Sequence, residues 1–281
     1  MGRGQTSGAQ RWPPGLAGRT AVVTGGGGAI CGAIARAFGR AGVRVAVWDL
    51  SEEAAARTAR AIRRAGGKAL AAACDVTARP QVQAEAERTV ERFGPVDILV
   101  NGAGGSRAQA TTSPDLSFFD ITDEALMATV ALNYAGTVIP SQVLGRGFAT
   151  ARRGVIINIA SVAGMRPLTR ALAYSNAKAA VVSFTQWLAV HMAIEYSPAI
   201  RVNAIAPGFV LTDQNRFLLV DERTGQPTQR GRRIMRQVPM GRYGEPDEMA
   251  GAALWLASDA AGFVTGAVIP VDGGLSAFAG V

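Results

Sequence analysis

The sequence predicts an α/β protein with one doubly wound parallel sheet of seven strands and helices on both faces. Short apolar segments alternate with helical segments along the chain, which is the order that produces parallel sheets. Runs such as Ala21-Val22-Val23 and Ile156-Ile157 are apolar without alternation, as in strands that are covered on both faces. The 281 residues are 48% hydrophobic, so a large core is available.

The expected strands are short runs rich in apolar and β-branched residues. They are Thr20–Thr24, Val43–Trp48, Ala69–Ala73, Asp97–Val100, Val155–Ile159, Arg201–Ile205 and Ala267–Val271. The expected helices have apolar residues three and four positions apart. They are Ala29–Arg40, Glu52–Ala65, Gln81–Phe93, Asp123–Gly147 as one helix or two, Ala171–Tyr196 and Pro246–Ala257. Glycines close the first strand, and Gly94-Pro95 ends the third helix.

The composition does not change along residues 16–281, so we expect a single domain there. Residues 1–15 are rich in Gly, Arg and Pro and contain no apolar segment, which predicts a disordered tail and not a secretory signal. Two polar segments, Gly104–Asp120 and Val210–Gly244, interrupt the alternation. Both follow the carboxyl ends of strands, where open α/β sheets bind ligands. They are either plain surface loops or the substrate-binding part of the chain, and we expect the second segment to be a substrate flap.

Cysteine and histidine usage excludes several classes of site. Cys31 and Cys74 have no metal-ligand spacing, and we expect two free thiols in a reducing, cytoplasmic compartment. His191 is the single histidine, so a zinc site built on several histidines is excluded, and we expect no metal. A Ser-His-Asp triad would depend on His191, which lies within a helical pattern and fits a partly buried structural role better.

The net charge of +8 raises nucleic acid as a partner. However, the basic residues are spread over the whole chain, and only two of the 29 are lysine. No interleaving of aromatic and basic residues, as single-strand binders have, is visible. We therefore expect no nucleic-acid partner. We expect no membrane span either, because polar residues interrupt every apolar run well before spanning length.

A glycine-rich segment, Thr24–Gly32, joins the first strand to the first helix. Glycines at this position allow a tight turn, and backbone N–H groups at a helix N-terminus bind a pyrophosphate. The arrangement is typical of a Rossmann-like dinucleotide site. Asp49 closes the second strand, where a carboxylate binds the adenosine ribose hydroxyls and repels a 2′-phosphate. The sequence therefore favours NAD over NADP, although Asp49 or Ser51 also suits the N-cap of the next helix.

The second constellation combines a phenol and an amine on one helix face. Tyr174 and Lys178 are four residues apart, so they face the same side of the helix. An ammonium beside a phenol favours the phenolate, and we expect it to lower the pKa of Tyr174. Such a tyrosine serves as a general acid and base without histidine. Ser161 lies thirteen residues earlier, directly after an expected strand, and Asn133 lies in the preceding helical segment.

With these motifs the chain resembles the short-chain dehydrogenase/reductase family over nearly all of residues 16–281. Cys31 departs from the usual last glycine of the glycine loop, and Gly102 departs from the second asparagine usual after the fourth strand. The resemblance implies a catalytic set of Asn133, Ser161, Tyr174 and Lys178. It implies cofactor contacts at Gly25, Gly28, Ala29, Ile30, Asp49, Asp75, Val76, Asn101, Gly102, Ala103, Tyr174, Lys178, Pro207, Gly208 and Val210.

The resemblance also implies roles. Tyr174 would exchange a proton with the reacting oxygen, and Ser161 would position that oxygen. Lys178 would hold the nicotinamide ribose, and Asn133 would shape its helix and hold a water of the proton relay; each of Ser161 and Asn133, taken alone, also fits a plain structural role. The expected oligomer is a homotetramer.

A narrower likeness concerns the branch of D-mannonate oxidoreductases of the fructuronate reductase type. It rests on Asn101–Gly105, Gln214-Asn215-Arg216 and the ending Asp272–Phe278. It implies an anionic small-molecule substrate that meets Gly105, Ser106, Gln214, Asn215 and Arg216.

The sequence leaves three functions open. The first is an NAD-dependent oxidoreductase of a sugar acid such as D-mannonate or D-fructuronate. The second is a reductase of another carbonyl, such as a 3-oxoacyl thioester or a gluconate-type substrate. The third is a non-catalytic nucleotide- or RNA-binding protein on the same fold, which the intact set of four catalytic positions disfavours.

Overall fold

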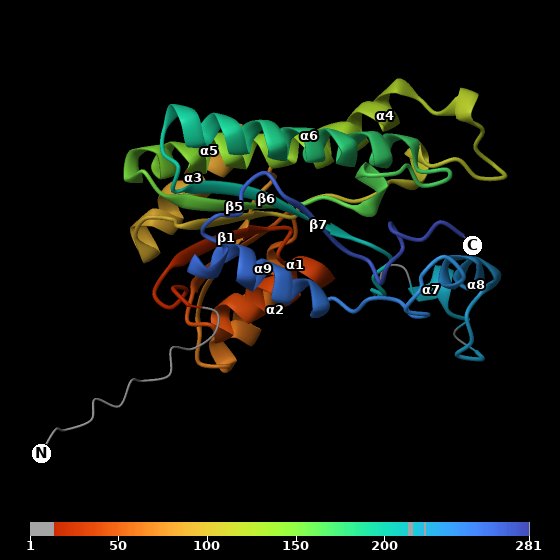
Figure 1. Cartoon of the computed structure of the whole chain (residues 1–281), viewed down its shortest axis with the longest axis horizontal. Helices are drawn as coiled ribbons and strands as arrows, with labels where there is room; N and C mark the ends of the chain where they lie inside the picture. Colours follow the sequence, from red (N-terminus) through yellow and green to blue (C-terminus); the bar gives the residue numbers. More distant parts are fainter. Residues whose placement is uncertain (1–13, 213–215, 222, 281) are drawn as a thin grey trace, which may run out of the picture.

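A parallel sheet of seven strands in the order β3-β2-β1-β4-β5-β6-β7 forms the centre of the molecule (Figure 1). The computed structural model describes residues 14–212, 216–221 and 223–280. The strands are β1 (Thr20–Thr24), β2 (Arg44–Asp49), β3 (Lys68–Ala73), β4 (Ile98–Asn101), β5 (Gly154–Ile159), β6 (Ile200–Pro207) and β7 (Val268–Val271). The order reverses between β1 and β4, and open α/β sheets bind their ligands at such a switch point. The predicted fold class is confirmed.

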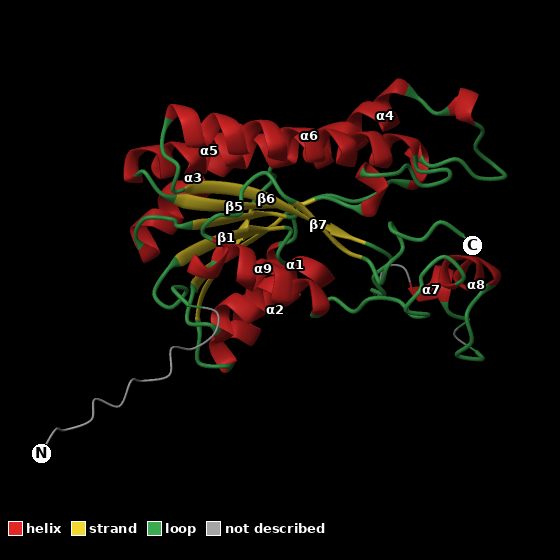
Figure 2. Ribbon diagram, in the orientation of Figure 1, coloured by secondary structure: helices red, strands yellow, loops and turns green. Residues whose placement is uncertain are grey.

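Two layers of helices cover the sheet (Figures 1 and 2). One face carries α1 (Ala29–Arg40), α2 (Glu52–Arg64) and α9 (Glu248–Ala257), and the other carries α3 (Arg79–Phe93), α5 (Gly136–Ala151) and α6 (Leu172–Glu195). Each layer encloses its own apolar core.

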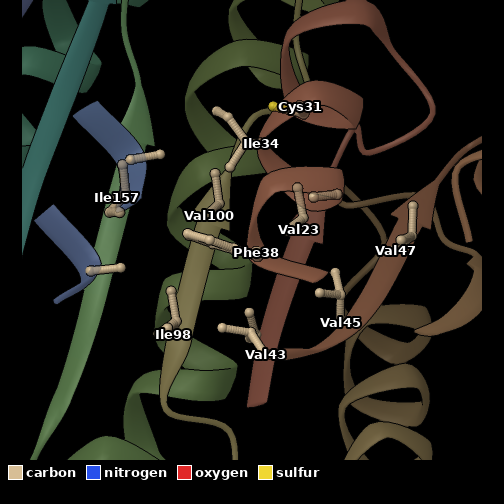
Figure 3. Close-up of a cluster of buried hydrophobic side chains, with 14 of the residues drawn as sticks. Val23, Cys31, Ile34, Phe38, Val43, Val45, Val47, Ile98, Val100 and Ile157 are labelled. Atoms are coloured by element: carbon tan, nitrogen blue, oxygen red, sulfur yellow. The ribbon is translucent and has the colours of Figure 1, made fainter. Parts of the chain in front are cut away.

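The core beneath α1 shows why this segment forms a helix on the sheet. Ile34 and Phe38 are four residues apart, fully buried, and packed with Val23 of β1 and Val100 of β4 (Figure 3). Burying one such side chain contributes roughly 1.5–3 kcal/mol. Because α1 is held this firmly, the glycine loop before it has a fixed place at the carboxyl ends of β1 and β4.

The helical segment expected over Asp123–Gly147 is interrupted. It consists of α4 (Asp123–Val130), one π-helical turn over Ala131–Ala135, and α5, which extends to Ala151. A π turn adds one residue to a helical turn and is frequent at functional sites. Here it carries Asn133.

The segment expected as a substrate flap has structure of its own. It contains two short helices, α7 (Arg216–Leu219) and α8 (Gln229–Met235), which the sequence pattern did not reveal. Val210 and Gly244, the expected ends of the flap, pair in an isolated parallel bridge. The flap therefore leaves and rejoins the body of the protein at one place.

Two further expectations concern the ends and helix α6. Residues 1–13 of the expected tail lie outside the described residues, while Pro14 accepts a hydrogen bond from the backbone N–H of Asp259.

Within the described part of the chain, α6 alone is long and apolar enough to cross a membrane. This is weak evidence, because α6 packs against β6 and α4 as a core helix of the α/β layers does. His191 on α6 is partly buried, as expected, and stacks on Trp187.

Candidate active site

The carboxyl ends of β1, β4, β5 and β6 meet at one edge of the sheet. The flap with α7 and α8 and the loop that leads into α4 both lie at this end of the molecule (Figure 1). The described residues that the sequence singled out for chemistry belong to these strand ends or to the segments that follow them, except Asp49 at the end of β2 and Asp75 and Val76 after β3. The expectation that both polar segments lie beside the site therefore agrees with the architecture.

The glycine loop and the end of β4 are joined closely. The hydroxyl of Thr24 accepts hydrogen bonds from the backbone N–H groups of Gly102 and Ala103, at 3.0 and 3.2 Å. Gly25 has φ +62°, and a Cβ there would lie 2.8 Å from the Ala103 nitrogen, so only glycine fits. Helix α1 starts after Gly28 with no side-chain cap and no acidic residue in its first turn. Its N-terminus is therefore suited to an anion such as a pyrophosphate.

The two departures from the family pattern touch each other. A Cβ built on Gly102 would lie 1.9 Å from the sulfur of Cys31, which is buried and free. The larger residue at position 31 is thus accommodated by the smaller residue at position 102. The structure explains why the departures occur together, which the sequence showed only as two separate substitutions.

Asp49 organises the loop that would receive the adenosine ribose. Its two carboxylate oxygens accept hydrogen bonds from the backbone N–H groups of Gly27 and Ser51, each at 3.0 Å. Ser51, in turn, is the N-cap of α2, since its side chain accepts from the N–H of Ala54. The alternative reading of Asp49 as the cap is therefore wrong. Asp49 lies between the glycine loop and the start of α2, and its contact with the ribose stays a prediction.

The remaining expected cofactor residues have mixed surroundings. Asp75 accepts hydrogen bonds from the N–H and the hydroxyl of Thr77, and Val76 is buried. The amide of Asn101 donates to Ser141 and Asn158, both at 2.9 Å. The Asn101 side chain therefore ties β4 to α5 and β5. The contact of Asn101 with a cofactor stays a prediction, and these hydrogen bonds add an internal role for its side chain.

Ser161, Tyr174 and Lys178, three of the predicted catalytic residues, lie close together in the candidate site. Ser161 follows β5 and is buried, and its hydroxyl lies close enough to the half-buried Tyr174 to act on the pKa of the phenol. The ammonium of Lys178 lies 5.8 Å from the centre of the Tyr174 ring. It donates to the carbonyl of Ile159 at 2.8 Å. The structure thus brings together three of the four catalytic residues that the sequence proposed.

The pKa of Tyr174 corrects one expectation. Burial raises the pKa of the phenol, and the hydrogen bond with Ser161 works in the opposite direction. Lys178 was expected to lower this pKa, but burial and not the ammonium dominates the environment of the phenol. Burial also lowers the pKa of Lys178 to about 8, because a buried ammonium loses its hydration.

Asn133 is fully buried and holds the loop after β4. Its amide donates to the carbonyl of Gly105, and its side-chain oxygen accepts from the N–H of Gly105, at 2.9 and 3.0 Å. A Cβ on Gly104 would lie 2.6 Å from that oxygen and 3.3 Å from the nitrogen of Lys178. Asn133 therefore fixes the Gly104–Gly105 backbone beside Lys178. The π turn that carries Asn133 left no signal in the sequence.

The expected substrate residues are distributed over the two flanking segments. Gly105 is fastened by Asn133, and the exposed Ser106 shares a hydrogen bond with Thr111. Arg216 is exposed at the start of α7. Gln214 and Asn215 lie outside the described residues.

The flap begins directly after Pro207 and Gly208, two residues of the predicted cofactor set. Pro207 ends β6, and Gly208 donates to the carbonyl of Val271 at 3.0 Å. An apolar cluster of Val162, Val238 and Leu275 joins the flap and the C-terminal segment to the residue after Ser161. The sequence pattern did not indicate this cluster, because its members come from three distant segments.

The depressed pKa of Lys178 gives a testable dependence of stability on pH. Below pH 8 the folded and unfolded chains both carry the proton, and the full cost of burying the charge is present. Between about 8 and the ordinary value of 10.5 the unfolded chain binds more protons, so this group makes stability rise with pH. We expect the free energy of unfolding of the wild type, relative to Lys178→Met, to rise by up to ~1.4 kcal/mol per pH unit there. Denaturant melts of both proteins from pH 7 to 10.5 measure it, and a constant difference would refute it.

An uncapped helix N-terminus after a glycine loop, together with a buried serine, a half-buried tyrosine and a buried lysine, is the arrangement of a nicotinamide-dependent oxidoreductase that acts on alcohol or carbonyl groups. A sequence profile described as enoyl-(acyl carrier protein) reductase matches residues 27–276. The chain belongs to the short-chain dehydrogenase/reductase family.

Individual relatives match almost from end to end. UxuB of Bacillus subtilis (strain 168), an uncharacterised oxidoreductase, is 42% identical over 95% of this chain and 98% of its own. A solved structure from Haemophilus influenzae, provisionally assigned as a D-mannonate oxidoreductase and containing bound NAD, is 39% identical with a TM-score of 0.89, and covers 95% of this chain and 98% of its own. A second solved structure is a provisionally assigned NAD(P)-dependent gluconate 5-dehydrogenase from Beutenbergia cavernae with bound NADP at low occupancy. It is 33% identical with a TM-score of 0.82, and covers 94% of this chain and 98% of its own.

Proposed function

We propose that this enzyme transfers a hydride between NAD and the carbonyl or secondary alcohol carbon of a sugar acid such as D-fructuronate or D-mannonate. The observation that carries the proposal is the basic flap beside an oxidoreductase site. From Arg216 to Arg242 the chain has seven arginines and two acidic residues. The likeness to the Haemophilus influenzae protein supports the same substrate class.

The chemistry assigned to the residues follows from their positions. Tyr174 exchanges a proton with the reacting oxygen, and Ser161, whose hydroxyl lies close to Tyr174, positions that oxygen. Lys178 and the glycine loop hold the cofactor, which supplies or accepts the hydride. Asn133 holds the loop at Gly105 and, in this proposal, a water of the proton relay.

A substrate panel tests the proposal. Absorbance at the NADH wavelength is followed with uronates, aldonates, their neutral polyol counterparts and a 3-oxoacyl thioester, in both directions and with NAD and NADP. We expect the highest kcat/KM with an acidic sugar and NAD. A preference for the thioester, or for neutral polyols, would overturn the sugar-acid assignment while leaving the oxidoreductase class intact.

Asp49 is expected to set the cofactor preference. The carboxylate binds the ribose hydroxyls and repels the 2′-phosphate of NADP. Asp49→Ala is therefore expected to lower kcat/KM with NAD and to raise it with NADP. Because Asp49 also accepts hydrogen bonds from Gly27 and Ser51, the melting temperature of the variant is measured alongside. A wild-type enzyme that prefers NADP would contradict this assignment.

Arg216 is proposed to meet the substrate carboxylate from the flap. Arginine binds a carboxylate through two parallel hydrogen bonds, and losing a charge-assisted contact costs roughly 1.5–3 kcal/mol, about ten- to a hundredfold in KM. Arg216→Ala is expected to raise KM for the acid far more than for its lactone or amide. Arg242→Ala is the matched control, because the guanidinium of Arg242 already binds both carboxylate oxygens of Glu248. This variant should leave the two KM values in their wild-type ratio. Equal changes for charged and neutral substrates would remove Arg216 from the site.

A homotetramer in the cytoplasm completes the proposal. Trp187, Val190 and Ile194 on the outer side of α6 are each at least 59% exposed, and an apolar helix face of this kind supports association with a second copy. The buried free thiols Cys31 and Cys74 suit a reducing compartment. Light scattering that gives the mass of the single 29.1 kDa chain would contradict the tetramer.

A further inference from the structure

The loop between the two catalytic hydroxyl groups carries an unbalanced positive charge. Between Ser161 and Tyr174 the chain contains Arg166 and Arg170 and no acidic residue. Neither arginine forms an ion pair with any described side chain. Because this loop connects both catalytic side chains, its charge lies at the catalytic end of the sheet.

The backbone of Arg170 is held in an unusual conformation. Its φ is +74°, and among the described residues the only other non-glycine residue with positive φ is Arg152. Arg152 is the C-cap of α5, where a left-handed residue is ordinary. Arg170 instead precedes α6, where a non-glycine residue with positive φ is strained. Such residues concentrate at ligand-binding sites.

Hydrogen bonds from both sides of the site fix this backbone. The carbonyl of Arg170 accepts from the N–H of Thr112, at 3.1 Å, so it joins the catalytic loop to the loop after β4. Leu168 donates its N–H to the hydroxyl of Ser175, the neighbour of Tyr174. The Cα of Arg170 is therefore anchored four residues before Tyr174, between the two segments that flank the reacting centre.

The two arginines differ in what their guanidinium groups contact. Arg166 donates to the carbonyl of Leu275 at 3.4 Å. Arg170 is exposed, and its guanidinium has no hydrogen-bond partner among the described residues. A strained, anchored arginine with free donors beside a catalytic tyrosine is suited to binding a ligand anion.

We propose that Arg170 is a specificity-determining residue that binds the carboxylate of the substrate. This inference rests on the proposed sugar-acid function and adds a recognition element to it. The anchored backbone presents the planar guanidinium fork before the substrate arrives, so little ordering is needed on binding. Arg216 belongs to the flap, whereas Arg170 belongs to the segment that joins Ser161 to Tyr174.

Three variants separate charge from backbone geometry. Arg170→Asn removes the charge and keeps a residue that tolerates positive φ. Arg170→Lys keeps the charge without the fork. Arg166→Gln is the matched control, since it removes the same charge from the same loop. KM and kcat are measured for a uronate and for its neutral lactone or amide, and NAD affinity and melting temperature verify that each variant is folded.

We expect Arg170→Asn to raise KM for the uronate about ten- to a hundredfold, with KM for the neutral compound and the NAD affinity nearly unchanged. Arg170→Lys should restore part of the loss, and Arg166→Gln should leave the ratio of the two KM values close to that of the wild type. Equal effects of Arg170→Asn on both substrates, or an equal effect of Arg166→Gln, would overturn the inference. If the wild type itself does not distinguish the acid from its neutral counterpart, the proposed sugar-acid function is wrong. If the wild type does distinguish them and Arg170→Asn does not change the preference, only the role of Arg170 is wrong.

Discussion

Tyr174→Phe is expected to lower kcat by about 10²–10⁴, the usual effect of removing a general acid or base. The phenol lies close to the hydroxyl of Ser161, and the ammonium of Lys178 lies 5.8 Å from the centre of its ring. The single histidine, His191, stacks on Trp187 farther along α6. Phenylalanine keeps the ring and its packing, so the affinity for NAD should change little. Steady-state rates and fluorescence titration with NADH measure the two quantities.

Tyr196→Phe provides the matched control for this experiment. Tyr196 is the C-cap residue of the same helix, α6, and is 42% exposed. Removing its hydroxyl should leave kcat near that of the wild type. If Tyr174→Phe also kept near wild-type turnover, the proton would have to come from another group, and the assigned mechanism would be wrong.

Gly102→Ala is expected to have the second large effect. The new Cβ would lie 1.9 Å from the sulfur of Cys31 and 3.0 Å from the carbonyl oxygen of Thr24. Such overpacking typically lowers the free energy of unfolding by about 1–3 kcal/mol. In chains of about 150–250 residues each kcal/mol lowers Tm by about 2–4 °C, and we expect a similar fall here. It should also displace the glycine loop and weaken NAD binding.

A double-mutant cycle isolates the contact between positions 31 and 102. Cys31→Ala removes the sulfur that causes the 1.9 Å clash and retains the Cβ, which is 3.4 Å from the added methyl group. The double variant Cys31→Ala/Gly102→Ala should therefore regain most of the stability lost in Gly102→Ala. The contact at Thr24 remains, so full recovery is not expected. Additive losses would show that the two positions do not accommodate each other.

The sequence allowed the fold and the proximity of the candidate catalytic residues to be predicted, because strands, helices and residue spacing are local patterns. The expected first strand, Thr20–Thr24, and the helix Ala29–Arg40 agree with the structure residue for residue. Tyr174 and Lys178 share a helix face by their spacing alone. Ser161 was placed near them by its position after a strand, and its effect on the pKa of Tyr174 agrees with that placement.

The features that escaped the sequence depend on tertiary contacts. The π turn that holds Asn133 and the positive φ of Arg170 have no composition of their own. The contact between Cys31 and Gly102 joins residues that are far apart in the chain. The pKa of Tyr174 was expected to fall, because spacing reveals a neighbouring ammonium but not the burial that opposes it.

Transfer of a labelled hydride tests the central claim most directly. The purified enzyme is incubated with D-fructuronate and NADH that carries deuterium at the transferring position of the nicotinamide. The product is then analysed by mass spectrometry and NMR. The account predicts one deuterium on the former carbonyl carbon with wild-type enzyme and a rate about 10²–10⁴ lower with Tyr174→Phe. An unlabelled product, or equal labelling rates for the two enzymes, would contradict it.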